Sequence, residues 1–222
     1  MKSKLIVALD VDTFQQAAAL VRATRDVVDV FKVGNQLFTR LGPRILALLH
    51  EQGKECFLDL KFHDIPSIVA KAVESATALK VSMLTVHACG GAEMLKAAAA
   101  VPNHPRLLGV TVLTSVSGDV RAEVLRLAKL AKECGLDGVI ASPHEIRSIR
   151  EAMGEEFLIV TPGIRPAKTK TDDQERVMTP AETIAAGANY IVVGRPIIEA
   201  DDPARAAANI ATEIASVAST SA

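Results

Sequence analysis

The ten residues FLDLKFHDIP, at positions 57–66, combine an apolar run with closely spaced charges. Asp59, Lys61 and Asp64 alternate in sign within six positions. Residues two apart on an extended strand face the same side, so Asp59 and Lys61 are expected to point inward together. Burying charges is costly unless they have partners. We therefore predict that these groups pair, and that Lys32, which ends another apolar run, VFKVG, joins them.

This arrangement predicts acid catalysis by Lys61. Flanking carboxylates favour the charged form of a lysine. A protonated amine held in place can deliver a proton to a carbanion, whereas attack on a carbonyl, as in a Schiff-base aldolase, needs the neutral amine. The alternative is a buried ion-pair network that only fixes the fold.

The elements that must position these residues alternate along the chain. Apolar, β-branched segments are each followed by an Ala-rich amphipathic stretch, and they span residues 4–11, 27–34, 56–62, 83–88, 106–113, 138–142, 157–163 and 190–195. Strands that alternate with helices indicate a parallel sheet. Eight such units in 222 residues favour a closed (β/α)₈ barrel, the TIM-barrel fold, formed as a single domain over residues 1–222. An open doubly wound sheet is the alternative.

Polar residues occur at the carboxyl end of nearly every predicted strand. They are Asp10, Lys32, Asp59 with Lys61, His87, Thr114 with Ser115, Ser142, the Pro162-Gly163 turn and Arg195. In a barrel these ends meet at one rim, where such enzymes place their active sites. The series therefore predicts an enzyme with its site at this rim.

The last two strands are followed by TPGIRP and VVGRP, which resemble phosphate-binding loops. Gly163 and Gly194 would let backbone N–H groups approach an anion closely, and the guanidinium of Arg195 matches phosphate oxygens. Gln174, in the long polar loop before the eighth strand, is a further candidate donor. Arg165 fits either phosphate binding or bracing of the loop. We predict a phosphorylated substrate.

Composition limits the other partners. The chain has 25 Lys and Arg against 26 Asp and Glu, so no general attraction to nucleic acid or membrane is expected. The apolar run at residues 5–9 is too short for a signal peptide or membrane span, and we expect a soluble cytoplasmic protein.

The cysteines and two of the histidines are assigned structural roles. Cys56, Cys89 and Cys134 lack the spacing of a zinc site or disulfide framework and are predicted to be small buried residues. His63 and His87 are predicted to be hydrogen-bonded histidines of the core or rim.

Taken together, the motifs resemble those of the orotidine 5′-phosphate decarboxylase family over almost the whole chain. The matching segments are VALD, KVG, DLKFHDIP, VTVLTS, TPGIRP, DQERVMTP and VVGRP. The resemblance implies a homodimeric (β/α)₈ barrel that converts orotidine 5′-monophosphate to UMP and CO₂, the last step of de novo pyrimidine nucleotide synthesis. It also implies that neither a metal nor an organic cofactor is needed.

The resemblance also implies a role for each site residue. Lys61 is similar to the proton donor to C6, Asp59 to the carboxylate that faces the departing CO₂, and Lys32 to their partner, which also reaches the ribose. Asp64 is similar to the residue that completes the Lys-Asp-Lys-Asp array from the other subunit. For substrate binding, Asp10 matches the ribose ligand, Ser117 or Ser115 the pyrimidine contact, and Gln174 and Arg195 the phosphate clamp.

One position departs from the family pattern, and two other functions stay open. Ile68 stands where the family usually has a threonine that helps to bind the nucleotide. Mg²⁺-dependent sugar-phosphate decarboxylases and synthases share the D-x-K-x-x-D strand, but they use an acid where this chain has Lys32, which would repel a divalent cation. A non-catalytic binder of phosphorylated ligands is the other alternative.

Overall fold

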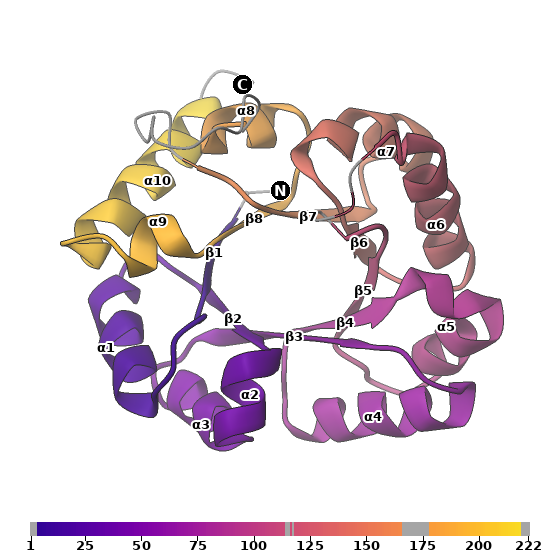
Figure 1. Cartoon of the computed structure of the whole chain (residues 1–222), viewed down its shortest axis with the longest axis horizontal. Coiled ribbons are helices and arrows are strands. Elements are labelled where there is room, and N and C mark those ends of the chain that lie inside the picture. The colour runs from indigo at the N-terminus through magenta and orange to yellow at the C-terminus, as the bar shows by residue number, and fades with distance from the viewer. Residues whose placement is uncertain (1–3, 114–115, 117, 166–177, 219–222) are drawn as a thin grey trace. The chain divides into compact units, whose positions relative to one another are not determined.

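Eight parallel strands follow one another in chain order around a closed barrel in the computed structural model (Figure 1). The structure describes residues 4–113, 116, 118–165 and 178–218. The strands are β1 (Lys4–Ala8), β2 (Val30–Gly34), β3 (Glu55–Phe62), β4 (Met83–His87), β5 (Arg106–Val110), β6 (Gly138–Ile140), β7 (Leu158–Pro162) and β8 (Tyr190–Val193). The predicted barrel is thereby confirmed, and the open sheet is excluded.

Helices separate the strands. They are α1 (Phe14–Thr24), α2 (Asn35–Leu41), α3 (Arg44–Glu51), α4 (Pro66–Ala78), α5 (Gly91–Ala99), α6 (Arg121–Glu133), α7 (Ile146–Met153), α8 (Pro180–Ala185), α9 (Arg195–Ile198) and α10 (Pro203–Ala218). Two 3₁₀ turns, η1 (Ala88–Gly90) and η2 (Pro143–Glu145), precede α5 and α7. Among the described helices, none has the length and apolar character needed to cross a membrane.

Local sequence explains where several helices begin. Thr13 caps α1, and Gln16 completes a reciprocal capping box with it. Thr179 and Glu182 form the same arrangement at the start of α8. Pro66 occupies the first turn of α4, where its missing N–H costs nothing. Strand β2 has the burial expected of a barrel strand covered on both faces, because every one of its residues except Lys32 is buried.

The chain divides into two compact units. The first comprises residues 1–56 and 161–222. In it β1 pairs with β2 and with β8, in a register that places Val7 beside Phe31 and Val193. Helix α10 packs against α1 and α8 on the outer side of these strands (Figure 1).

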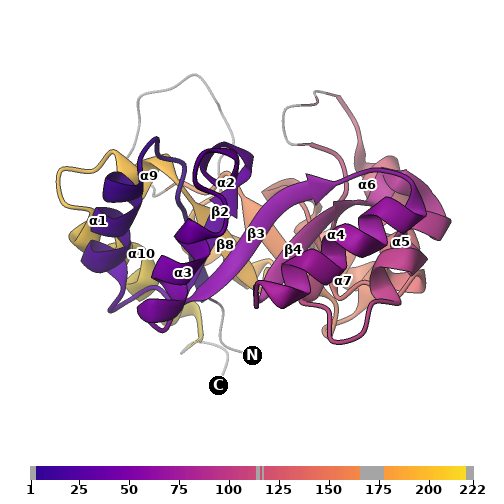
Figure 2. The same ribbon diagram turned by 90° about the horizontal axis from the view of Figure 1, so that it is seen from below.

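The second unit comprises residues 57–160. In it β4 pairs with β3 and β5, and β6 pairs with β5 and β7. Helix α4 lies beside α5, and α6 beside α7 (Figure 2). Gly109 of β5 leaves room for Ala131 and Leu136, which a β-carbon at that position would crowd at 3.1 and 3.3 Å.

The prediction that all three cysteines are buried is wrong for one of them. Cys56 and Cys134 are buried, whereas Cys89 is exposed because it lies in η1, just beyond the last residue of β4. Burial raises the pKa of the Cys56 thiol to about 12, so this residue is an inert part of the core.

Candidate active site

The predicted acid–base pair of β3 is present. The Lys61 Nζ atom donates to Asp59 Oδ2 at 2.9 Å, and Thr85 Oγ1 donates to Asp59 Oδ1 at the same distance. Asp59 is 9% exposed, whereas the Lys61 side chain is 30% exposed. The carboxylate is therefore held from two sides in the protein interior, and the ammonium that it orients stays accessible to a ligand.

The backbone at Lys61 departs from the regular strand that the sequence predicts. Its φ angle is +51°, which is unusual for a residue with a side chain, and a register shift makes three residues of β3 (59–61) face the single residue Thr85 of β4. Such a conformation costs on the order of 1–3 kcal/mol and persists only where the surroundings impose it. Lys61 belongs to β3, as predicted, but the regular extended geometry assumed at this residue is wrong. The Lys61–Asp59 contact forms at a bulge of the strand.

Two histidines lie beside this pair. The rings of His63 and His87 are 5.6 Å apart, and the buried Nδ1 atom of His87 has no hydrogen-bond partner among the described residues, contrary to the prediction of a hydrogen-bonded histidine. Burial lowers the pKa of His87; His63 and Lys61 lower it further, and Asp59 opposes them. His87 is therefore neutral at pH 7.

This shift predicts a pH-dependent stability. Because the pKa of His87 is lower in the folded than in the unfolded chain, the unfolded chain binds more protons as the pH falls below about 6.5. The free energy of unfolding of the wild type is therefore expected to decrease from pH 7 to pH 5. His87→Gln should show a shallower decrease in urea titrations at each pH. His50→Gln, on the exposed side of α3, is the control and should keep the wild-type slope. A wild-type slope in His87→Gln would contradict this assignment.

The first unit holds a second charged pair, at the ends of β1 and β2. Lys32 Nζ donates to Asp10 Oδ1 at 3.0 Å, with the lysine side chain 13% and the aspartate side chain 54% exposed. A β-carbon at Gly34 would lie 3.1 Å from Lys32 Nζ, so glycine at this position leaves room for the ammonium. A β-carbon at Gly194 would lie 3.6 Å from Asp10 Oδ2. The loop after β8 therefore lies against the same carboxylate.

The loop that carries Asp10 is braced by α2. Gln36 Nε2 donates to Asp12 Oδ1 at 2.7 Å, and Arg40 Nη1 donates to the Asp12 carbonyl at 2.9 Å. No motif in the sequence indicates this brace, because Gln36 and Arg40 lie on a helix and not at a strand end. Arg195, the first residue of the short helix α9, follows Gly194 and is exposed, as a phosphate ligand requires.

Among the residues that the structure describes, Asp64 forms no ion pair with Lys61 of the same chain. Its Oδ1 atom accepts the Ile65 N–H at 2.7 Å, and the residue is exposed immediately before α4. Two large apolar side chains flank it on the surface, Ile65 with 61% and Ile68 with 45% of their area exposed. This part of the second unit therefore presents a carboxylate next to an exposed apolar pair.

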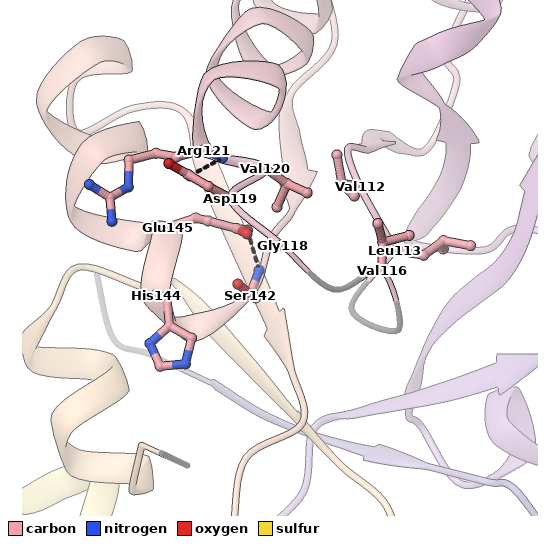
Figure 3. A pocket seen from close by; sticks show the side chains of 10 residues that line it. All are labelled: Val112, Leu113, Val116, Gly118, Asp119, Val120, Arg121, Ser142, His144 and Glu145. Carbon is pink, nitrogen blue, oxygen red and sulfur yellow. Dashed lines mark hydrogen bonds between the residues drawn. The ribbon is translucent and has the colours of Figure 1, made fainter. Parts of the chain in front are cut away.

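A pocket of about 250 Å³ opens between the loop after β5 and the turn η2 (Figure 3). Val112, Leu113 and Val116 form its apolar side, and Ser142, His144 and Glu145 lie opposite. Glu145 is buried, and its carboxylate accepts the Ser142 N–H at 2.8 Å, which fixes the polar side. The pocket therefore combines an apolar side with a fixed polar one.

Several predicted site residues lie outside the described part of the chain: Ser115, Ser117 and Gln174. Val116 and Gly118, next to the two serines, line the pocket. Arg165 is half-buried at the end of the described segment after β7, and Gly163 has a φ angle of +79°, which explains the glycine in this turn.

Comparison with known proteins identifies the family. Residues 3–210 match the family model described as "Orotidine 5'-phosphate decarboxylase / HUMPS family". The chain belongs to this family. Among its relatives is a protein of Syntrophotalea carbinolica named orotidine 5′-phosphate decarboxylase, which is 51% identical over 96% of both chains. A protein of Nitrosococcus oceani with the same name is 48% identical over 97% of this chain and 99% of its own length.

Solved structures of the orotidine 5′-phosphate decarboxylase family show the same fold. The crystal structure of the enzyme from Lactobacillus acidophilus is 40% identical and covers 96% of this chain and 99% of its own, with a TM-score of 0.83. The crystal structure of the enzyme from Pyrococcus horikoshii OT3 is 27% identical and covers 95% of this chain and 99% of its own, with a TM-score of 0.82. The barrel is thus retained across members of the family that share only about a quarter of their residues with this chain.

Proposed function

We propose that this protein decarboxylates orotidine 5′-monophosphate to UMP and CO₂. The observation that carries the proposal is the Lys61–Asp59 pair, in which a buried carboxylate orients an accessible ammonium in a member of this family. The names of relatives at 45–51% identity support the same substrate.

The proposed reaction needs no electron acceptor in the protein. The bond between C6 and the carboxylate carbon breaks, its electron pair stays on C6 in an orbital of the ring plane, and CO₂ departs. Ring carbonyls stabilise such a pair poorly, so a positive group placed at C6 lowers the barrier. Lys61 supplies that charge and then donates a proton to C6, and its neutral amine regains a proton from solvent.

The remaining residues are proposed to bind the rest of the nucleotide. Asp10 and Lys32 suit the ribose hydroxyls, because a carboxylate accepts and an ammonium donates hydrogen bonds. Arg195 and Gln174 are proposed to bind the phosphate, and Ser115 or Ser117 the pyrimidine; Gly194 and Arg165 would complete the phosphate loops. Energy gained at the distant phosphate can then be used to stabilise the transition state at C6. We propose that the Lys61–Asp59 and Lys32–Asp10 pairs act on one nucleotide. Family membership supports this, as do their complementary roles at C6 and at the ribose.

The direct test is the change in absorbance when the purified protein is mixed with orotidine 5′-monophosphate. Rapid conversion to UMP, undiminished after treatment with a chelator, is expected. Loss of activity in the chelator, restored by Mg²⁺, would favour the metal-dependent sugar-phosphate enzymes instead. Tight binding of the nucleotide without conversion would favour a non-catalytic binder. The expected cytoplasmic location stays a prediction, which cell fractionation would test.

We also propose that the protein is a homodimer in which Asp64 of one chain approaches Lys61 of the other. The exposed carboxylate beside Ile65 and Ile68 supports this arrangement, since interfaces combine apolar side chains with a few charged ones. Ile68 in place of the usual threonine adds apolar area at this position. In a two-fold dimer each site would then be complete only with residues from both chains.

Mixing two inactive variants tests the shared site. Lys61→Ala and Asp64→Ala homodimers each lack one component of every site. Random exchange of chains rebuilds one complete site in each mixed dimer, so activity per site should return to about one quarter of the wild-type value. Sedimentation should give twice the 23.5 kDa chain mass. A fully active species with the mass of one chain, or no recovery after proven exchange, would contradict the shared site.

A further inference from the structure

Thr85 links the backbone of Lys61 to Asp59, the carboxylate that also accepts the Lys61 ammonium. Its Oγ1 atom accepts the Lys61 backbone N–H at 2.9 Å and donates its own proton to Asp59 Oδ1 at 2.9 Å. The other oxygen of Asp59 accepts the Lys61 ammonium, also at 2.9 Å. These three bonds close a ring that runs from the backbone of Lys61 through one hydroxyl and one carboxylate to its side chain.

The Thr85 hydroxyl bonds to the backbone of β3 at the shift in register between β3 and β4. The extra residues of β3 between Leu58 and Phe62 face Thr85 alone, so the Lys61 N–H bonds to a side chain of β4. Thr85 is completely buried, and its neighbours on β4, Leu84 and Val86, are apolar core residues. A buried polar group is retained where its hydrogen bonds are all used, and here donor and acceptor are both engaged with β3.

We infer that Thr85 is a positioning residue for the reaction, a role that rests on the proposed function. It holds Lys61 at its positive φ angle and fixes the rotation of the Asp59 carboxylate, so that the ammonium has one defined direction. A displacement of about 1 Å in a catalytic group can cost on the order of 10²-fold in rate. Loss of the hydroxyl is therefore expected to lower kcat with little effect on nucleotide binding.

Two pairs of variants isolate the hydroxyl. The first pair is the wild type and Thr85→Val, whose side chains at this position have nearly the same shape but differ in the hydroxyl. The second pair, Thr85→Ser and Thr85→Ala, repeats the comparison without the methyl group. In each pair, removal of the hydroxyl is expected to lower kcat by about 10²-fold, while KM and the dissociation constant of UMP change by less than about threefold. The second pair keeps the test decisive if Thr85→Val folds poorly, and serine should restore most of the activity.

Thr24→Val is the matched control. Thr24 is also completely buried and donates its hydroxyl proton to one acceptor, the Leu20 carbonyl in α1. Its loss should lower the melting temperature but leave kcat unchanged. If folded Thr85→Val and Thr85→Ala keep kcat within about threefold of their hydroxyl-bearing partners, Thr85 does not position Lys61.

A second readout is independent of turnover. The rate at which an amine-acylating reagent modifies Lys61 can be followed by peptide mass spectrometry, with exposed Lys129 of α6 as the internal reference. Thr85→Val should change the rate at Lys61 relative to Lys129, because the ammonium is no longer held in one direction. This change is expected whether or not the wild type decarboxylates the nucleotide. If the proposed function fails, the role of Thr85 in holding Lys61 can therefore still be measured. An unchanged ratio of the Lys61 and Lys129 modification rates would overturn that role.

Discussion

Lys61→Ala is expected to lower kcat for orotidine 5′-monophosphate by at least about 10⁴-fold, because the variant lacks both the positive charge at C6 and the proton that C6 receives. This loss corresponds to about 5.5 kcal/mol of transition-state stabilisation. UMP binding should remain measurable, since the ribose and phosphate contacts are assigned to other residues. Removal of the lysine also leaves Asp59 without the ammonium that it orients, so a lower melting temperature is expected.

The matched control for this variant is Lys129→Ala. Lys129 lies on the exposed face of α6, with 71% of its side chain accessible, and pairs weakly with Glu133 at 3.8 Å. Its replacement should leave kcat and KM unchanged. Both variants are compared by stopped-flow absorbance, with circular dichroism to verify folding. Decarboxylation by folded Lys61→Ala within about tenfold of the wild-type rate would contradict the assignment of Lys61 as the acid.

Arg195→Ala is expected to raise KM for orotidine 5′-monophosphate on the order of 10²-fold, because a charged, bidentate contact to phosphate oxygens is lost. The exposed position of Arg195 after Gly194 lets the guanidinium reach an anion. The phosphate-free nucleoside orotidine has no group for this contact. Its kcat/KM is therefore expected to change by less than about threefold in the same variant.

Comparison of the two substrates separates phosphate binding from a general loss of structure. Arg22→Ala, on the exposed side of α1, is the control and should behave as wild type with both substrates. An equal decrease in kcat/KM for nucleotide and nucleoside in Arg195→Ala would show that Arg195 supports the fold or the ring site and does not bind phosphate.

The barrel is predictable from sequence because its signals are local and repeated. Runs such as residues 27–34 and 83–88 are apolar, β-branched and separated by amphipathic stretches, so period and length identify each strand. The Lys61–Asp59 contact is also predictable, since charges of opposite sign two residues apart in an apolar strand must find partners.

Features that depend on register between strands are not predictable in this way. The bulge at Lys61 and the ring closed by Thr85 arise because β3 carries extra residues opposite β4. The sequence of either strand taken alone does not indicate this mismatch. A threonine in a strand is ordinary by propensity. The contact between Lys32 and Asp10 likewise depends on the pairing of β1 with β2.

Exchange of the C6 proton of UMP in D₂O, followed by NMR, tests most directly whether Lys61 transfers the proton. If Lys61 donates a proton to C6 in the forward direction, the same group must remove it in the reverse direction. The wild type should therefore replace the C6 proton by deuterium, and Lys61→Ala saturated with UMP should not. Exchange by Lys61→Ala at the wild-type rate would show that another group transfers this proton.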